Sequence, residues 1–219
     1  MNKENNSEDF TFLCLNAKKV KVLLVGGGIS ALVKAKSFLK KGFTVHCIAP
    51  SFKEELFSLK SEKLKITIGN FEDYLINTCH LVVICTSDNR INKHIRELCD
   101  SNCKVYIDTT IPEESMATLC ATTSSKETSV GVRLKGKSPK TSQFLANKIK
   151  NYIATYDDYI SFVTELRRRM KDFPKRLEVL DFVSSEDFLF FFQRSYGEKV
   201  LDLFYGGESI EFENSYKKE

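Results

Sequence analysis

Short apolar runs alternate with amphipathic segments through the first hundred residues of the chain. Several runs are continuously apolar, which is typical of parallel strands that are buried on both faces. Helical periodicity lies between the runs at 30–41 and 88–100, with weaker helical patterns at 52–61 and 71–77. This alternation predicts an α/β fold with a doubly wound parallel sheet and right-handed crossovers. The expected strands are 20–25, 44–49, 64–68, 80–86 and 104–108.

The pattern changes after Thr109. Residues 109–126 are rich in Thr, Ser and Glu, and 128–134 have the pattern of one further strand. Gly136-Lys137-Ser138-Pro139 interrupts the chain before an amphipathic helix expected over 140–156. Only short helical patterns follow, which predicts a small helical region without further strands. The helices expected there are 159–173, 175–183, 187–193 and 199–204.

Composition fits a folded globular chain, with 42% hydrophobic and 28% charged residues and a mild net charge of +4. One local basic cluster stands out, consisting of Arg167, Arg168, Arg169, Lys171, Lys175 and Arg176. A solvated helix face and the attraction of an anionic partner both explain such a cluster. We favour the solvated face, and we expect no nucleic-acid partner, because the cluster has no interleaved aromatic residues and no nucleic-acid motif.

The chain has seven cysteines, an odd number, and residues 1–9 are polar without an apolar leader segment. No run approaches the ~18 apolar residues of a membrane span. We therefore expect no membrane partner, a reducing cytoplasmic setting and free thiols. Cys99 and Cys103 could share a helix face as metal ligands, but no second Cys or His pair completes the set. No metal site is expected.

A glycine-rich turn directly follows the first apolar run and reads Gly26-Gly27-Gly28-Ile29-Ser30-Ala31. In a strand–turn–helix, Gly26 permits the tight turn, Gly28 lets the backbone approach a pyrophosphate, and Ala31 keeps helix and strand close. The free N–H groups of the first helical turn, which includes Ile29 and Ser30, would face the phosphates. A purely structural turn is the alternative. In this context the motif predicts a dinucleotide-binding site.

The end of the second expected strand reads His46-Cys47-Ile48-Ala49-Pro50-Ser51 and carries no carboxylate. An acid at this position usually holds the ribose hydroxyls of NAD. Here backbone groups at Pro50 and the Ser51 hydroxyl would have to hold the ribose. NADP therefore stays open beside NAD, with Lys53 as the candidate for its extra phosphate.

Polar residues also end the fourth and fifth expected strands. Thr86 falls where a hydroxyl can contact the nicotinamide half of a dinucleotide, and Asp88 is interpreted as a helix N-cap. Asp108 ends the fifth strand, where it is either a turn former or a carboxylate directed into the substrate crevice. Position alone does not separate these two roles.

Together these motifs resemble the precorrin-2 dehydrogenase family, the NAD-dependent module of siroheme synthases. That family shows V-G-G-G-x-V-A, then V-A-P, A-T-D-D-x-x-x-N, N-V-x-D-x-P and G-G-K-S-P along the chain. The resemblance runs from about residue 10 to residue 206 and accounts for the missing acid. The matching residues here are Val25–Ala31, Ile48–Pro50, Thr86–Asn89 with Asn92, Val105–Asp108, and Lys135–Pro139.

The resemblance implies an organisation in four stretches. These are a Rossmann NAD(P)-binding domain over 1–112, a strand and helix dimerisation region over 113–156, a helical C-terminal domain over 157–207, and a polar tail over 208–219. It also implies a homodimer in which the substrate crevice is shared.

The implied function is NAD-dependent oxidation of precorrin-2, an anionic tetrapyrrole, to sirohydrochlorin. Asp108 is then the candidate base, and Arg133, Lys137 and Ser138, together with the basic cluster, are candidate substrate anchors. Some family members also insert ferrous iron, and no residue here separates one activity from two.

Two departures from the family pattern keep rival functions open. Asp108 and Pro112 are four residues apart, and Arg133-Leu134-Lys135 replaces the usual Ser-Thr-Gly. The rivals are a dehydrogenase of another class, and an NAD(P)-binding regulatory or degenerate module without activity.

Overall fold

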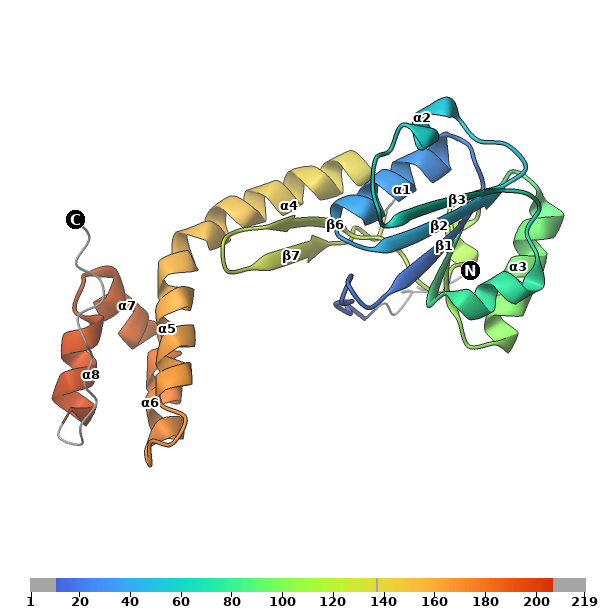
Figure 1. Ribbon diagram of the computed structural model, residues 1–219. Helices are drawn as coiled ribbons and strands as arrows, with labels where there is room; N and C mark the ends of the chain where they lie inside the picture. Colours follow the sequence, from blue (N-terminus) through green and yellow to red (C-terminus); the bar gives the residue numbers. More distant parts are fainter. Residues whose placement is uncertain (1–10, 137, 207–219) are drawn as a thin grey trace, which may run out of the picture. The chain divides into compact units, whose positions relative to one another are not determined.

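The computed structural model describes residues 11–136 and 138–206 (Figure 1). The chain divides into two compact units between Leu119 and Cys120. The first unit contains the parallel sheet, and the second contains a two-stranded hairpin and the remaining helices. The finer division into stretches expected above remains a prediction, and the polar tail 208–219 lies outside the described residues.

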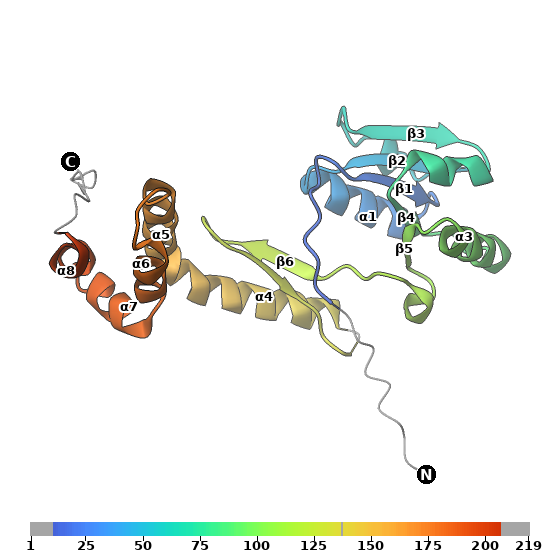
Figure 2. The same cartoon turned by 90° about the horizontal axis from the view of Figure 1, so that it is seen from below.

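Five parallel strands form the sheet of the first unit in the order β3-β2-β1-β4-β5, which can be followed in Figure 2. The strand order reverses between β1 and β4, and open α/β sheets in general bind ligands beyond the carboxyl ends of the strands at such a reversal. The predicted doubly wound sheet is confirmed. Its strands are β1 Lys21–Val25, β2 Thr44–Ala49, β3 Leu64–Ile68, β4 Leu81–Ile84 and β5 Val105–Asp108.

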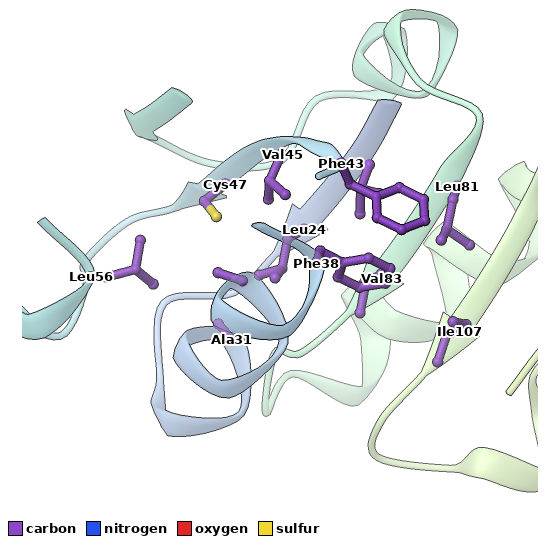
Figure 3. Packing of buried hydrophobic residues seen from close by; sticks show 12 residues of the cluster. Leu24, Ala31, Phe38, Phe43, Val45, Cys47, Leu56, Leu81, Val83 and Ile107 are labelled. Carbon is purple, nitrogen blue, oxygen red and sulfur yellow. The ribbon is translucent and has the colours of Figure 1, made fainter. Parts of the chain in front are cut away.

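Both faces of the sheet are covered, which is why several of its strands read as continuous apolar runs. Val22 and Leu24 pack with α1 (Ile29–Lys40) in one buried cluster, part of which Figure 3 shows. Leu23 and Val25 point to the opposite face and pack with α3 (Asn89–Ser101) in a second cluster. Successive strand residues thus alternate between two cores.

The weaker helical patterns were only partly right. The expected helix over 52–61 is reduced to α2 (Glu54–Phe57), in which Leu56 is the one buried residue. Phe52 and Leu59, on either side of this short helix, also pack against the core cluster, but from outside the helix. The pattern over 71–77 forms a 3₁₀ helix, η1 (Asp73–Thr78), which buries Leu75 and Ile76.

The second unit begins with an antiparallel hairpin, β6 (Ala121–Ser124) and β7 (Ser129–Val132). Only the second strand was expected, because β6 consists of Ala, Thr and Ser and lacks an apolar run. Helix α4 (Pro139–Ile153) lies along this hairpin in Figure 1 and continues through η3 (Ala154–Tyr156).

Four short helices complete the second unit around an aromatic core. Phe188 is fully buried, and its ring lies near those of Tyr159, Phe162, Phe182 and Phe192. The four expected helices are all present with shifted ends. They are α5 Asp157–Arg169, α6 Arg176–Val183, α7 Glu186–Gln193 and α8 Gly197–Tyr205.

Candidate functional site

The glycine turn after β1 packs tightly at its first two residues. Gly26 has φ of +132°, and a Cβ added to it would lie 2.5 Å from the carbonyl oxygen of Cys85. A Cβ on Gly27 would lie 1.9 Å from the carbonyl oxygen of Ser51. Both contacts are impossible for a side chain, so these glycines are required by the fold itself.

Gly28 differs from its two neighbours. Its φ of −83° is open to any residue, and a Cβ added to it would meet no atom within 4 Å. Gly28 is the N-cap of α1, which has neither a side-chain cap nor an acidic residue in its first turn. The backbone N–H groups of the first turn, which includes Ile29 and Ser30, therefore lie at the uncapped positive end of the helix, a position that favours anionic groups in general.

The end of β2 lies beside this turn. The Gly26 N–H donates to the Ile48 carbonyl oxygen at 2.9 Å, and the Lys53 N–H donates to the Gly27 carbonyl oxygen at 2.9 Å. Pro50 and Ser51 are exposed between these two bonds. The structure thus brings Pro50 and Ser51 next to the glycine turn, and the exposed Lys53 stands at the same edge.

Thr86, at the end of β4, is held inside a hydrogen-bond network. Its hydroxyl donates to Oδ1 of Asn92 at 2.6 Å and accepts a bond from the Asp88 N–H at 3.0 Å. Asn92 is 1% exposed, and its Nδ2 donates to the Thr86 carbonyl oxygen and to Oγ1 of Thr110. Asp88 caps α3 through bonds from two backbone N–H groups, which confirms its expected N-cap role.

Asp108 is buried at the end of β5, and hydrogen bonds occupy both of its carboxylate oxygens. Oδ1 accepts bonds from the Thr110 N–H at 2.8 Å, the Thr110 hydroxyl at 2.6 Å and the Ile111 N–H at 3.2 Å. Oδ2 accepts a bond from Nη1 of Arg96. Burial by itself would raise the pKa of Asp108, but these four hydrogen bonds hold it below its usual value. The carboxylate organises the turn over 109–111, and its role as a base stays a prediction.

Arg96 and Thr110 are the members of this network that sequence reasoning missed. A signal was present for Arg96, which follows Asn92 by one helical turn and so lies on the same face of α3. Two polar residues on the inner face of an amphipathic helix indicate polar partners at the neighbouring strand ends. No pattern in the sequence identifies Thr110 as the partner of Asp108.

Ser30 connects the first turn of α1 with the ends of β4 and β5. Its hydroxyl donates to Oγ1 of Thr109 at 3.2 Å and contacts Sγ of Cys85 at 3.7 Å. The structure therefore brings the predicted residues of the first unit to one edge of the sheet. They are Gly26, Gly28, Ile29, Ser30, Pro50, Ser51, Thr86 and Asp108.

The candidate substrate anchors belong to the second unit. Arg133 follows β7, and Ser138 precedes α4, where its hydroxyl lies 2.6 Å from that of Thr141. Lys137 lies outside the described residues. In the basic cluster, Arg168 and Arg169 both bind the carboxylate of Glu165, whose pKa their hydrogen bonds lower to about 2. Internal ion pairs of this kind favour the interpretation as a solvated helix face.

All seven cysteines are free thiols. Burial raises the pKa of Cys47 to about 12, of Cys79 to about 11 and of Cys99 to about 12, so these thiols stay protonated. Within residues 11–136 and 138–206, no three His, Cys, Asp or Glu side chains group as a metal site. None of the helices described there has the length and apolarity needed to cross a membrane.

Comparison with known proteins extends this description. Residues 13–121 match a family described as "Putative NAD(P)-binding". The chain is 28% identical over 165 residues to a siroheme synthase of Thioalkalivibrio sulfidiphilus, covering 74% of this chain and 34% of that protein. It is 25% identical over 158 residues to a precorrin-2 dehydrogenase of Priestia megaterium, covering 70% of this chain and 76% of that protein.

The similarity to siroheme synthases and to a precorrin-2 dehydrogenase agrees with the resemblance seen in the motifs. The chain spans about a third of the length of the first siroheme synthases it matches. Among solved structures, it is similar to SirC, a precorrin-2 dehydrogenase, with a TM-score of 0.60 and 21% identity. That match covers 81% of this chain and 90% of SirC, and it confirms the expected fold.

Proposed function

We propose that this chain is an NAD-dependent dehydrogenase that oxidises precorrin-2 to sirohydrochlorin. The observation that carries the proposal is the open N-terminus of α1 at Gly28, beside the ends of β4 and β5. Gly26 and Gly27 are explained by contacts within the protein, whereas the space in front of Gly28 suits a pyrophosphate. The printed names of the relatives support the choice of substrate.

The residues present fit a nicotinamide dinucleotide. The N–H groups at Gly28, Ile29 and Ser30 would hold the pyrophosphate, and Pro50 and Ser51 the ribose of the adenosine half. Thr86 would lie against the nicotinamide half. The bound cofactor accepts a hydride, so that precorrin-2 and NAD⁺ give sirohydrochlorin, NADH and a proton. The task of the chain is to hold the two rings together in a crevice without water.

Asp108 is the proposed acceptor of the proton. Its carboxylate has no exposed surface and accepts hydrogen bonds at both oxygens, so proton transfer requires the turn over 109–111 to move. Deprotonation is already ensured, because the pKa of Asp108 lies below its usual value. In the second unit, Arg133, Lys137 and Ser138 are the proposed anchors for substrate carboxylates.

The proposal includes three further features. NAD is the preferred cofactor, with NADP accepted less well. The chain forms a homodimer through its second unit, where Phe144 and Tyr152 of α4 expose large aromatic surfaces. The free thiols suit the reducing conditions of a cytoplasm. Ferrous iron would enter only as a second substrate, after sirohydrochlorin has formed.

One observation favours a second candidate, an NAD(P)-binding module without turnover. The Asp108 carboxylate is fully buried and paired with Arg96, and this arrangement suits a structural role at least as well as proton transfer. In this alternative the chain binds the dinucleotide but does not catalyse the oxidation.

The deciding experiment measures binding and turnover separately on the full chain. NAD is titrated by calorimetry, and precorrin-2 oxidation is then followed under anaerobic conditions through NADH absorbance. Binding of NAD with turnover supports the proposal, and Gly28→Asp serves as the control that should abolish both. Binding without turnover supports the inactive module, and absence of dinucleotide binding overturns both candidates.

A further inference from the structure

Lys34 lies on α1 one helical turn after Ser30 and therefore shares its face of the helix. Ser30 contacts Thr109 at 3.2 Å and Cys85 at 3.7 Å, at the ends of β5 and β4. Long side chains on a helix lean toward its N-terminus, which directs the Lys34 ammonium back toward this group. Burial raises the pKa of the Cys85 thiol, whereas bonds from Thr109 and Ser30 and the positive charge of Lys34 lower it. The positive charge of Lys34 thus affects Cys85, which lies at the carboxyl edge of the sheet.

Lys34 is partly buried and makes no ion pair or hydrogen bond in the part of the chain that the structure describes. The neighbouring lysines of α1, Lys36 and Lys40, are exposed. The nearby Asp108 carboxylate is already paired with Arg96. Partial burial of an ammonium group without a counter-charge is unfavourable, and binding of an anionic ligand group would remove this cost.

We propose that Lys34 binds a carboxylate of the tetrapyrrole substrate beside the nicotinamide end of the crevice. This inference rests on the proposed function and adds a substrate contact within the first unit. A phosphate of the dinucleotide offers the same chemistry, but in the proposed site the pyrophosphate is already held by the backbone N–H groups at the start of α1. The measurement of NAD binding below separates the two sources. Lys34 shares its helix face with Ser30, whose hydroxyl contacts Thr109 and Cys85 at the strand ends where the substrate must meet the nicotinamide.

The experiment compares Lys34→Met with Lys36→Met, an exposed lysine on the same helix, and with Lys34→Arg. Sirohydrochlorin binding is measured by fluorescence and NAD binding by calorimetry, so neither readout needs turnover. Precorrin-2 oxidation is measured where the parent is active. We expect Lys34→Met to weaken tetrapyrrole binding about 10-fold to 100-fold and to raise KM more than it lowers kcat. Lys34→Arg and Lys36→Met should stay within about 3-fold of the parent.

Equal or greater loss of NAD affinity in Lys34→Met would assign the residue to a cofactor phosphate and overturn the inference. Unchanged binding of both ligands would overturn it as well. A parent that binds sirohydrochlorin but does not oxidise precorrin-2 refutes the proposed reaction alone, since the binding comparison for Lys34 still holds. A parent that binds no tetrapyrrole refutes both.

Discussion

The side chains of Arg96 and Asp108 form an ion pair at the carboxyl end of β5, with exposed fractions of only 12% and 0%. Arg96 also lies 3.7 Å from the exposed carboxylate of Glu114, while Ser115 receives a hydrogen bond from the Asp108 N–H. The ion pair therefore joins α3 to the turn that follows the sheet. It determines the conformation of the segment that faces the proposed nicotinamide position.

Asp108→Asn should destabilise the chain at neutral pH. The carboxylate has a folded-state pKa below its unfolded value of about 3.9, so its contribution is present above that pH and is lost as pH falls through the folded-state pKa. We expect the free energy of unfolding at pH 7 to fall by about 3 kcal/mol, because Arg96 is left buried without its partner. The difference from the parent should shrink below about pH 4. Denaturant unfolding at several pH values measures both.

Asp88→Asn is the matched control for this variant, because Asn is an equally good N-cap on an exposed helix start. Equal stability of Asp108→Asn and the parent at pH 7 would refute the structural importance of the ion pair. If Asp108 accepts the proton, turnover should also fall by ~10²-fold in conditions where the variant is folded. Turnover near the parental rate would remove Asp108 from the reaction.

Gly28→Asp should abolish dinucleotide binding while the fold is retained. The added Cβ meets no protein atom within 4 Å, and the carboxylate beyond it places negative charge where the pyrophosphate would lie. Gly28→Asn has the same shape without the charge and should bind more weakly than the parent but better than the Asp variant. Calorimetric titration with NAD and a thermal melt of each variant test this.

Gly27→Ala is the contrasting variant, because its Cβ would lie 1.9 Å from the Ser51 carbonyl oxygen. It should lower the melting temperature clearly, whereas Gly28→Ala should not. Equal stability of the two alanine variants would contradict the separation of structural and ligand-facing glycines.

Lys53→Ala tests the choice between NAD and NADP. The end of β2 carries no acid that would repel a 2′-phosphate, so we expect NAD to be preferred by less than about 3 kcal/mol. Lys53 stands exposed beside Gly27, and its loss should weaken NADP binding while NAD binding stays within about 2-fold. A strong NADP preference that disappears in Lys53→Ala would reverse the proposed choice of cofactor.

Asp157→Asn should loosen the tip of the β6–β7 hairpin. The Asp157 carboxylate accepts bonds from the Ser125 hydroxyl at 2.7 Å and from the N–H groups of Lys126 at 3.0 Å and Glu127 at 3.2 Å. Amide hydrogen exchange at Lys126 and Glu127 should accelerate about 5-fold or more in this variant. Asp158→Asn, at the next and exposed position, should leave those rates unchanged.

The sequence predicted correctly those strands and helices whose local pattern of apolar residues shows which of their faces are buried. Strands such as β1 and β4 were found because burial on both faces leaves a nearly continuous apolar run, and α1 and α3 because their inner faces repeat at helical spacing. The hairpin strand β6 was missed, since its four residues Ala-Thr-Thr-Ser form no apolar run and alternate between partly buried and exposed positions. Its strand state depends on pairing with β7, which no local signal in 121–124 encodes.

At the candidate site, the residues alone specify the sheet, the glycine turn and the order of polar groups along the strand ends. Steric demands at Gly26 and the N-cap of Asp88 act over a few residues, so they can be inferred before any packing is known. Which groups satisfy the Asp108 carboxylate was decided only by the tertiary structure. The position of Arg96 depends on how α3 packs against β4 and β5, and hydrogen bonds between separate elements follow from that packing rather than from the periodicity of either one.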